Sequence, residues 1–542
     1  MDCTQLLSAI GSAARFRPRR LSALIGLAIS LALSSAFGQS GDPGAGNAAP
    51  VPFAALHLYY ISKTGDDYKA GTSPATAWKT PRHPVNCGDV ILVEPGTYDS
   101  TWAFGQNNWG EVSNCPSWSG GIDGKGGVYF AVVLCAGPHL GSCNVTSANG
   151  PDFRVDRSNW AIEGFSMTQP GGGAAGANGC ASATSESAAT QHHIAFINNV
   201  AVNCNLSGFG SYSWTLPGGG VDQFAVVGAI TYNDAASLNS GGLCASGVAV
   251  IPVGGPDPSE GTHVFVAGNF GYQNVNAPSG AGCNTDGEGL IFDSWACSNY
   301  VYQGVAEQNV WWANGSAGFE IFPNCLNNGD KAKIYAFGNT SYGNQRDPVR
   351  KGAASDLMIN QLAPTSDGGG FYDIFDNIFV TTKATSGDNA STPVYTAGVA
   401  LNNNNVSLVK IDHNVIWQSN PGSVVKEGNP NTDVWIRGYR KKTSFPFGIN
   451  DYKDPVFANA GALATEAPDC ANYTNTTACM NQGYHVAANL TPKAAAGYGY
   501  VAPGPCKSDP FFPIWLKGVV FLRWNGSSLT ENPGLITKPC DL

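Results

Sequence analysis

Charged residues are scarce in this chain, and basic residues are the scarcer kind. Asp, Glu, Lys and Arg make up 13% of the 542 residues, and 39 acidic against 29 basic side chains give a net charge of −10. Nucleic acid binding needs a concentrated basic surface that neutralises phosphates. A dilute acidic chain without basic stripes therefore argues against a nucleic-acid partner.

Long apolar runs are also missing, except for one short run near the start. Leu21–Leu33 is apolar, follows the basic segment Arg15–Arg20 and precedes the small residues Ala36–Gly38. The run is too short to span a bilayer and has the layout of a secretory signal. We therefore predict a signal peptide at 1–38, a Gly/Ala/Pro linker at 39–57, no membrane span, and a secreted protein, extracellular or periplasmic.

Metal-binding spacings of cysteine and histidine are absent. No CxxC or HxxxH pattern occurs, which disfavours a zinc site. Of the 15 cysteines only Cys3 lies in the signal, and the even number that remains is typical of disulfides in an exported protein. Cys135/Cys143 and Cys470/Cys479 are close enough to close small loops, and Cys283/Cys297 brackets an acidic strand, but the pairing stays open.

What the chain does have is a repeated theme: small or apolar residues, an Asn, and then an apolar run. Its copies recur at roughly 30–40 residues, a period typical of solenoids built from short strands. Asn tolerates the left-handed backbone of a tight corner, and stacked Asn amides hydrogen-bond from coil to coil. The alternative is that Asn is merely common in loops. The repeated Asn positions are Asn199, Asn269, Asn309, Asn339, Asn377 and Asn414, with a degenerate copy at 227–230.

A second theme of five residues follows each Asn and alternates with period two. Its second and fourth residues are apolar in every copy and should face the core. The two themes predict two parallel sheets in each coil, with the length variation confined to loops on one side. The copies are 247–251, 289–293, 318–322, 356–360 and 398–402.

The fold class predicted from these patterns is all-β, a right-handed parallel β-helix with caps at both ends. Residues 58–453 should form the solenoid, with an opening module at 58–98. Residues 454–542 lose the Asn theme and carry four cysteines, which predicts a disulfide-tied C-terminal cap.

Five segments carry a resemblance to a known family. Tyr59–Gly65, Gly71–Thr80 and Gly88–Tyr98 resemble the opening of secreted right-handed parallel β-helix proteins. Asn284–Gly287 and Ala317–Ile321 resemble central coils of the pectate-lyase-like superfamily. The nearest pattern is that of calcium-dependent pectate lyases, which carry an Asp-Gly turn and then an Asp-Asp-Gly strand.

The same segments also depart from that family. Its paired aspartates fall at Ser316-Ala317 here, and its lysine base would fall near Met358. Asp286 and Glu320 are the acidic positions that match. The Asp-Asp and Gly-His-Gly motifs of polygalacturonases are absent, which argues against a hydrolase of that family.

The candidate site combines an acidic and a basic group. Asp286, Glu288 and Glu320 are the expected ligands of Ca²⁺, the cofactor that the resemblance implies. Glu320 with either Asp293 or Glu288 is the candidate catalytic pair. The alternative for these acids is a solvated acidic face. The basic residues of the next coil are candidates for binding an anionic sugar and abstracting its proton, or for simply pairing with the acids. They are Arg346, Arg350 and Lys351.

Aromatic and amide side chains complete the predicted site. Trp295 and Trp312 are candidates for stacking on sugar rings, although Trp311 and Trp312 are consecutive, so one of them should face inward. Asn360 and Asn402 end later copies of the second theme and are assigned to substrate binding. His192, His193 and His413 fall inside the coil themes and are expected to be structural.

These residues predict a secreted, monomeric enzyme that degrades polysaccharide. The first hypothesis is a lyase that cleaves an anionic, uronate-containing chain by β-elimination. The second is a glycoside hydrolase or glycan transferase that uses a carboxylate pair. The third, from a different class, is a non-catalytic glycan-binding or adhesion protein.

Overall fold

The structure is a computed structural model in which the chain divides into the unit Met1–Ala49 and the unit Pro50–Leu542. Only the second unit is described below, so the predicted signal peptide and most of the linker lie outside the described residues. The described ranges are 55–105, 110–116, 129–137, 142–147, 150–169, 179–185, 189–212, 219–234, 245–254, 261–275, 286–325, 330–346, 354–362, 364, 369–382, 391–398, 408–418, 433–437, 440–442, 449–451, 454–457, 511–516 and 522–531.

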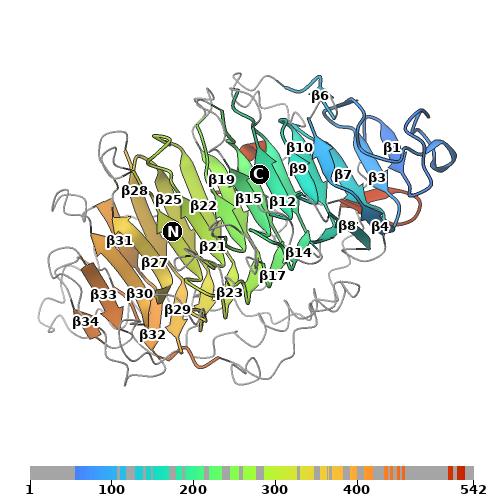
Figure 1. Ribbon diagram of the computed structural model, residues 1–542. Helices are drawn as coiled ribbons and strands as arrows, with labels where there is room; N and C mark the ends of the chain where they lie inside the picture. Colours follow the sequence, from blue (N-terminus) through green and yellow to red (C-terminus); the bar gives the residue numbers. More distant parts are fainter. Residues whose placement is uncertain are drawn as a thin grey trace, which may run out of the picture. The chain divides into compact units, whose positions relative to one another are not determined.

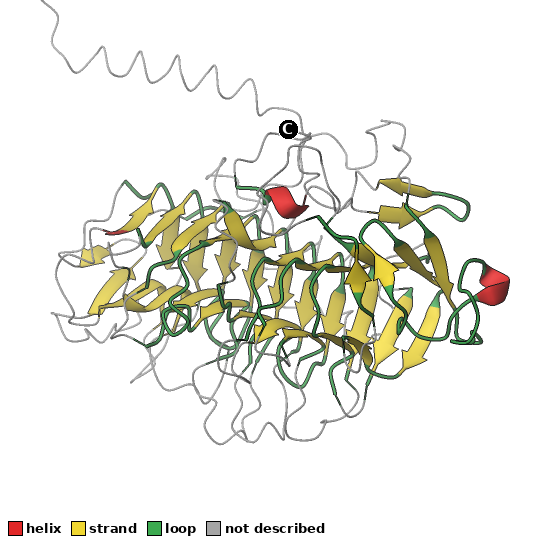
Figure 2. Cartoon of the chain, turned by 90° about the horizontal axis from the view of Figure 1, so that it is seen from above, coloured by secondary structure: helices red, strands yellow, loops and turns green. Residues whose placement is uncertain are grey.

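Successive coils stack their strands into three long sheets, which run side by side along the solenoid (Figures 1 and 2). Over the described residues the sheets hold 11, 10 and 11 strands. Consecutive strands pair in parallel throughout the first and second sheets, and throughout the third sheet except at its last two strands. The predicted right-handed parallel β-helix is therefore confirmed. Over the same residues, no helix is long and apolar enough to cross a membrane.

The first sheet contains β1 (Leu58–Ile61), β3 (Val90–Val93), β7 (Ala131–Cys135), β10 (Trp160–Glu163), β13 (Ile194–Ile197), β16 (Phe224–Val227), β19 (Thr262–Ala267), β22 (Gln303–Glu307), β25 (Lys333–Phe337), β28 (Phe371–Phe375) and β31 (Val409–Asp412). The second contains β4 (Gly96–Asp99), β8 (Cys143–Thr146), β11 (Phe165–Thr168), β14 (Val200–Val202), β17 (Ile230–Tyr232), β20 (Phe270–Tyr272), β23 (Val310–Trp312), β26 (Thr340–Tyr342), β29 (Ile378–Thr381) and β32 (Val415–Gln418). The third contains β5 (Trp102–Phe104), β9 (Phe153–Val155), β12 (Ala181–Thr184), β15 (Phe209–Tyr212), β18 (Val248–Val250), β21 (Leu290–Asp293), β24 (Phe319–Phe322), β27 (Ala354–Leu362), β30 (Ser391–Gly398) and the antiparallel β33 (Asp433–Arg437) and β34 (Arg440–Lys442).

The expectation of two sheets per coil is wrong, because the Asn theme is bent in its middle. In the copy around Asn309, β22 ends at Glu307 and β23 begins at Val310, so one continuous theme supplies strands to two sheets. The second theme supplies the third sheet. A two-residue corner leaves no gap in the hydrophobic pattern, so the sequence alone does not separate the two strands.

The Asn column forms a buried ladder at this first corner. Each side-chain amide donates to the Asn carbonyl oxygen of the next coil, as from Asn309 to Asn339 at 2.9 Å, and the ladder continues to Asn450. Ala229 interrupts it between Asn199 and Asn269. The left-handed backbone belongs to the residue before each ladder position, such as Gln308 at φ 52°, and not to the ladder Asn itself.

A second ladder, which the sequence analysis missed, lies at the corner between the second and third sheets. Asn274, Asn314 and Asn344 are stacked through amide hydrogen bonds of 2.9 Å, and Asn344 donates to the Asp356 carboxylate at 2.7 Å. Gly318 lies beside this ladder, where an added Cβ would come within 1.9 Å of the Ser341 hydroxyl. Gly318, which begins this copy of the second theme, is therefore required, because a side chain there would collide with Ser341, a hydrogen-bond partner of the ladder residue Asn344.

The third sheet has the predicted register. The inward side chains of four successive strands, β18, β21, β24 and β27, are buried in the core. Their register aligns Val248, Leu290, Phe319 and Leu357. The last predicted copy, 398–402, lies almost wholly outside the described residues. The outward side chains of β21, β24 and β27 therefore share one face.

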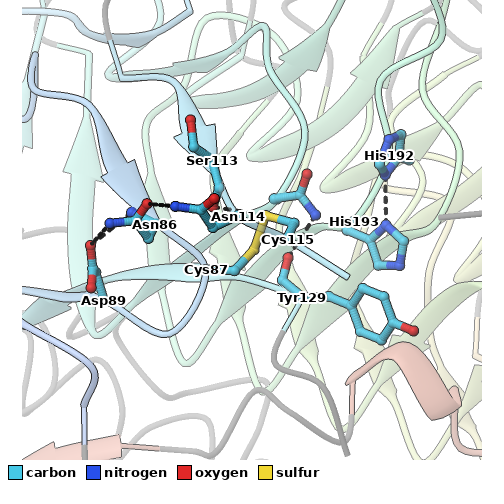
Figure 3. Close-up of a disulfide and its surroundings, with 10 residues drawn as sticks. Asn86, Cys87, Asp89, Ser113, Asn114, Cys115, Tyr129, His192 and His193 are labelled. Carbon is cyan, nitrogen blue, oxygen red and sulfur yellow. Dashed lines mark hydrogen bonds between the residues drawn. A yellow bond between two sulfur atoms is a disulfide. The ribbon is translucent and has the colours of Figure 1, made fainter. Parts of the chain in front are cut away.

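In the opening module, Trp78 packs against the first strand. β1 pairs with β3, the 3-10 helix η1 (Pro74–Thr76) lies between them in sequence, and the Trp78 ring stacks on Tyr59 and His83. The short strands β2 (Val85–Asn86) and β6 (Val112–Ser113) are joined by the Cys87–Cys115 disulfide (Figure 3).

Three more disulfides occur among the described residues. Cys135–Cys143 closes a small loop, as predicted, and Cys180–Cys204 links the residue before β12 to the segment between β14 and β15. Cys297 pairs with Cys325, so Cys283 is not its partner. Cys283, Cys470 and Cys479 lie outside the described residues.

The described C-terminal part packs against the outer face of the first sheet. It includes the 3-10 helix η8 (Ile514–Leu516) and the hairpin β35 (Leu522–Trp524) and β36 (Leu529–Glu531). Trp515 is buried on this face and donates to the Thr262 carbonyl oxygen at 2.8 Å (Figure 2 shows η8 beside the strands). This segment lies on the flank of the solenoid, and the cysteines of the predicted cap lie outside the described residues.

Candidate functional site

The outer face of the third sheet carries two of the predicted acidic residues, Asp293 and Glu320, in adjacent rows. Register pairs Ile291 with Glu320 and with Met358 in one row, and Asp293 with Phe322 in the next, which Asn360 continues. Asp293 and Glu320 are therefore diagonal neighbours on one face, at a Cα separation of about 8 Å for parallel strands. The predicted catalytic pair is brought together.

Asp293 ends β21 and is only partly exposed. The pKa of its carboxyl group is raised to about 6, because burial and the negative charge of Glu288 outweigh the opposing effect of a 2.7 Å hydrogen bond from the Ser294 hydroxyl. A carboxyl group with a pKa near 6 exchanges its proton close to neutral pH, as a general acid or base requires.

Glu320 is central in β24 and only 3% exposed. Its neighbours in the row are Ile291 and Met358, which withdraw it from water, and the Asn360 amide donates to its carboxylate at 3.2 Å. Asn360, which was predicted to bind substrate, therefore lies beside Glu320 and donates a hydrogen bond to it.

The other two acids enter the site from the segment before β21. Glu288 is buried and accepts a 2.7 Å hydrogen bond from the Ser246 hydroxyl of the preceding coil. Asp286 is partly exposed. Asp286 and Asp293 both lie near Tyr212. Burial raises the pKa of the Tyr212 phenol to about 12, and the negative charges of the two carboxylates act in the same direction.

These acids do not fit the predicted calcium site. Within the described ranges, no three Asp, Glu, His or Cys side chains converge closely enough to hold a metal ion. Glu288 is hydrogen-bonded to Ser246, and Glu320 to Asn360. We therefore derive no step through Ca²⁺.

The basic group is only partly described. Arg346 is exposed, but its guanidinium donates to the Gly343 carbonyl oxygen at 2.8 Å and lies near Tyr342, at the corner between the second and third sheets. These contacts of Arg346 do not join it to Asp293 or Glu320. Arg350, Lys351 and Asn402 lie outside the described residues.

The two tryptophans predicted to bind sugar are placed elsewhere. Trp295 is 1% exposed, packs on Phe292 in the core and donates to the Val250 carbonyl oxygen, so it has no face for a ligand. Trp312 lies on the outer face of the second sheet against Tyr272, because β23 belongs to that sheet. Trp311 faces inward, as the consecutive pair required.

Phe322 and Tyr212 were not among the predicted site residues. Tyr212 ends β15 and folds over Gly210, where an added Cβ would lie 2.5 Å from its ring. Phe322 packs against a buried apolar group that includes Tyr212, Ile251 and Ile291. The outward position of Phe322 was readable from the period-two register, but its neighbours depended on which coils pair.

The predicted structural histidines lie away from this face. His193 is buried and is stacked on Tyr129, with its Nδ1 atom 2.6 Å from Nδ1 of His192 (Figure 3). His413 follows β31 of the first sheet.

No protein-family model matches the sequence, and no curated protein matches it either. Several solved structures have a similar fold. A pectate lyase, Pel9A, has 12% identity and a TM-score of 0.38, over 85% of this chain and 96% of that chain. A rhamnogalacturonan lyase has 13% identity and a TM-score of 0.32, over 68% and 90%. The GH136 lacto-N-biosidase of Eubacterium ramulus has 11% identity and a TM-score of 0.30, over 73% and 67%. At these identities the likeness concerns the fold alone.

Proposed function

We propose that this protein is a carbohydrate-active enzyme that cleaves polysaccharide at the outer face of the third sheet, with Asp293 and Glu320 as its acid and base pair. The observation that carries the proposal is the placement of these two partly desolvated carboxyl groups as diagonal neighbours on one face. Two such groups are what glycosidic bond hydrolysis requires.

The two carboxyl groups suit different roles. Asp293, whose carboxyl pKa is raised to about 6, carries its proton in mildly acidic solution and donates it to the leaving glycosidic oxygen. Glu320, held by the Asn360 amide, acts as the carboxylate that activates water or attacks the sugar. The glycan transferase reading uses the same pair with a sugar hydroxyl in place of water.

The lyase reading is the second candidate, and the sequence of the next coil favours it. In the sequence, Arg346, Arg350 and Lys351 precede β27, the strand that pairs with β24 and so lies beside Glu320. A cation there would neutralise a uronate carboxylate so that a proton is lost and β-elimination follows. The described face is acidic and would repel a uronate, so this candidate depends on residues outside the described ranges.

The test is a screen of neutral and anionic polysaccharides read by new reducing ends and by ultraviolet absorbance. We expect new reducing ends without absorbance, and their loss in both Asp293→Asn and Glu320→Gln, by 100-fold or more in kcat. Absorbance from unsaturated ends would support the lyase. Glycan binding without either product would support the non-catalytic reading, and normal turnover in both variants would refute the assigned pair.

A further inference from the structure

A row of three partly exposed residues, one of which is Asp293 of the carboxyl pair, crosses the third sheet. Asp293, Phe322 and Asn360 are outward at equivalent positions of β21, β24 and β27, and all three are partly exposed. Neighbouring outward residues of this face are buried, including Ala249, Ile251 and Glu320. The row therefore combines an aromatic ring with a carboxyl group on one side and an amide on the other.

The Phe322 ring is held in place by outward residues of earlier coils on the same face. It packs against the buried cluster of Tyr212, Ala249, Ile251 and Ile291, which comes from three earlier coils. Tyr212 itself is fixed over Gly210, as described above. A ring that is already immobilised loses little conformational entropy when a ligand stacks on it.

We infer that Phe322 is the stacking platform for the sugar residue that the site cleaves, with Asp293 and Asn360 hydrogen-bonding on either side. This inference rests on the proposed function. Strands about 4.8 Å apart place the two polar groups about 10 Å from each other, so a single pyranose ring fits between them. A pyranose presents apolar C–H groups on its faces and hydroxyls at its rim, which matches an aromatic ring with polar flanks. The ligand class is a hexopyranose chain, bound by its ring face.

The inference assigns Phe322 a role in binding and not in chemistry. Phe322→Ala should therefore raise KM or Kd by at least tenfold while kcat falls far less, and Phe322→Tyr should restore binding because it keeps the ring. Phe337→Ala is the matched control, since Phe337 is another partly exposed Phe at the end of a strand, but on the first sheet.

Binding is measured in the Glu320→Gln background, by calorimetry with tetrasaccharides of galacturonate and of a neutral β-linked glucan. The expected result is binding of at least one probe that is lost in Phe322→Ala and kept in Phe322→Tyr and Phe337→Ala. Equal affinity in Phe322→Ala and its parent would overturn the inference, as would binding of neither probe by the parent. An unchanged thermal unfolding midpoint shows that lost affinity is not lost folding.

The two hypotheses fail separately. If Asp293→Asn and Glu320→Gln turn over normally but Phe322→Ala does not bind, the proposed acid and base pair is wrong and the platform stands. If those variants lose turnover while Phe322→Ala binds normally, the platform is wrong and the proposed function stands.

Discussion

At the scale of single residues, burial controls the pKa values of the carboxyl groups. Asp293 and Asp356 both follow the same physical rule: a low-dielectric surrounding disfavours the charged form and raises the pKa. They differ in access to solvent, since Asp293 is partly exposed and Asp356 is fully buried at the end of the second ladder. Asp293 is therefore suited to proton transfer, and Asp356 affects stability.

The role of Asp293 predicts the direction of one limb of the pH profile. If its carboxyl group is the general acid, kcat/KM falls tenfold per pH unit as the pH rises well above about 6, because the proton needed for the leaving group is lost. Ser294→Ala removes the hydroxyl that stabilises the carboxylate, so this limb should move to higher pH. A rate that increases through pH 6 would identify Asp293 as a base instead.

Asp356 should make the fold less stable at alkaline pH. Burial raises its carboxyl pKa to about 7, although hydrogen bonds from Asn344, Ser341 and Gln345 lower it. The folded state therefore binds the proton more tightly than the unfolded state, and stability is lost as the pH rises from the unfolded pKa through about 7. Asp356→Asn keeps the ladder contacts, so it should gain roughly 2–4 kcal/mol over the wild type at pH 8.

Denaturant unfolding at pH 5 and pH 8 measures this effect. Asp67→Asn is a control of opposite sign: although burial raises the pKa of Asp67, hydrogen bonds from Thr80 and Lys79 lower it below the ordinary value. That variant should lose stability above pH 4. A difference between wild type and Asp356→Asn that does not change with pH would contradict the assignment.

At the scale of elements, the corners of the coil matter more than the strands. The strands adjoining the two ladders are three to six residues long in most coils, and each corner aligns its Asn side chains with those above and below. Buried amides are costly unless every donor and acceptor is paired, and stacking pairs them all.

Asn309→Ala tests the first ladder. The Asn309 side chain donates to Val266 and Asn339 and accepts two hydrogen bonds from Asn269, all at 2.9–3.0 Å. Its loss leaves buried groups of both neighbouring coils without partners, so unfolding should require roughly 3–5 kcal/mol less. The free energy of unfolding in urea measures this, with Asn525→Ala in an exposed turn as the control. A cost below about 0.5 kcal/mol would mean that the ladder is not stabilising.

At the scale of the whole described unit, the solenoid has an apolar outer face that the C-terminal segment covers. Val132, Ala161, Ala225 and Phe265 face outward on the first sheet and are buried in one cluster with Trp515 and Leu522. A flat apolar sheet face of this kind is an aggregation hazard when it is bare. The C-terminal segment therefore protects the fold.

Trp515→Ala should weaken this cover. Trp515 packs on Phe130 and His193 and hydrogen-bonds to Thr262, so its truncation should cost roughly 3–5 kcal/mol and expose apolar surface. A lower thermal unfolding midpoint and increased binding of a hydrophobic dye are the expected measurements. Tyr68→Ala, at a fully exposed aromatic residue, is the control. An unchanged midpoint would show that the segment is dispensable for stability.

The sequence by itself determined the repeat, the parallel β-helix, the inward and outward faces of the third sheet and the acidic character of the site. These follow from period and side-chain chemistry, which are local properties. Only the tertiary structure decided that Trp295 is core, that Trp312 belongs to another sheet, that Arg346 turns to a corner, and that Phe322 lies between Asp293 and Asn360. The physical reason is that contacts across the axis depend on which residues stack at equal height. Because the loops between the strands differ in length, the sequence alone does not show which residues lie at equal height in neighbouring coils.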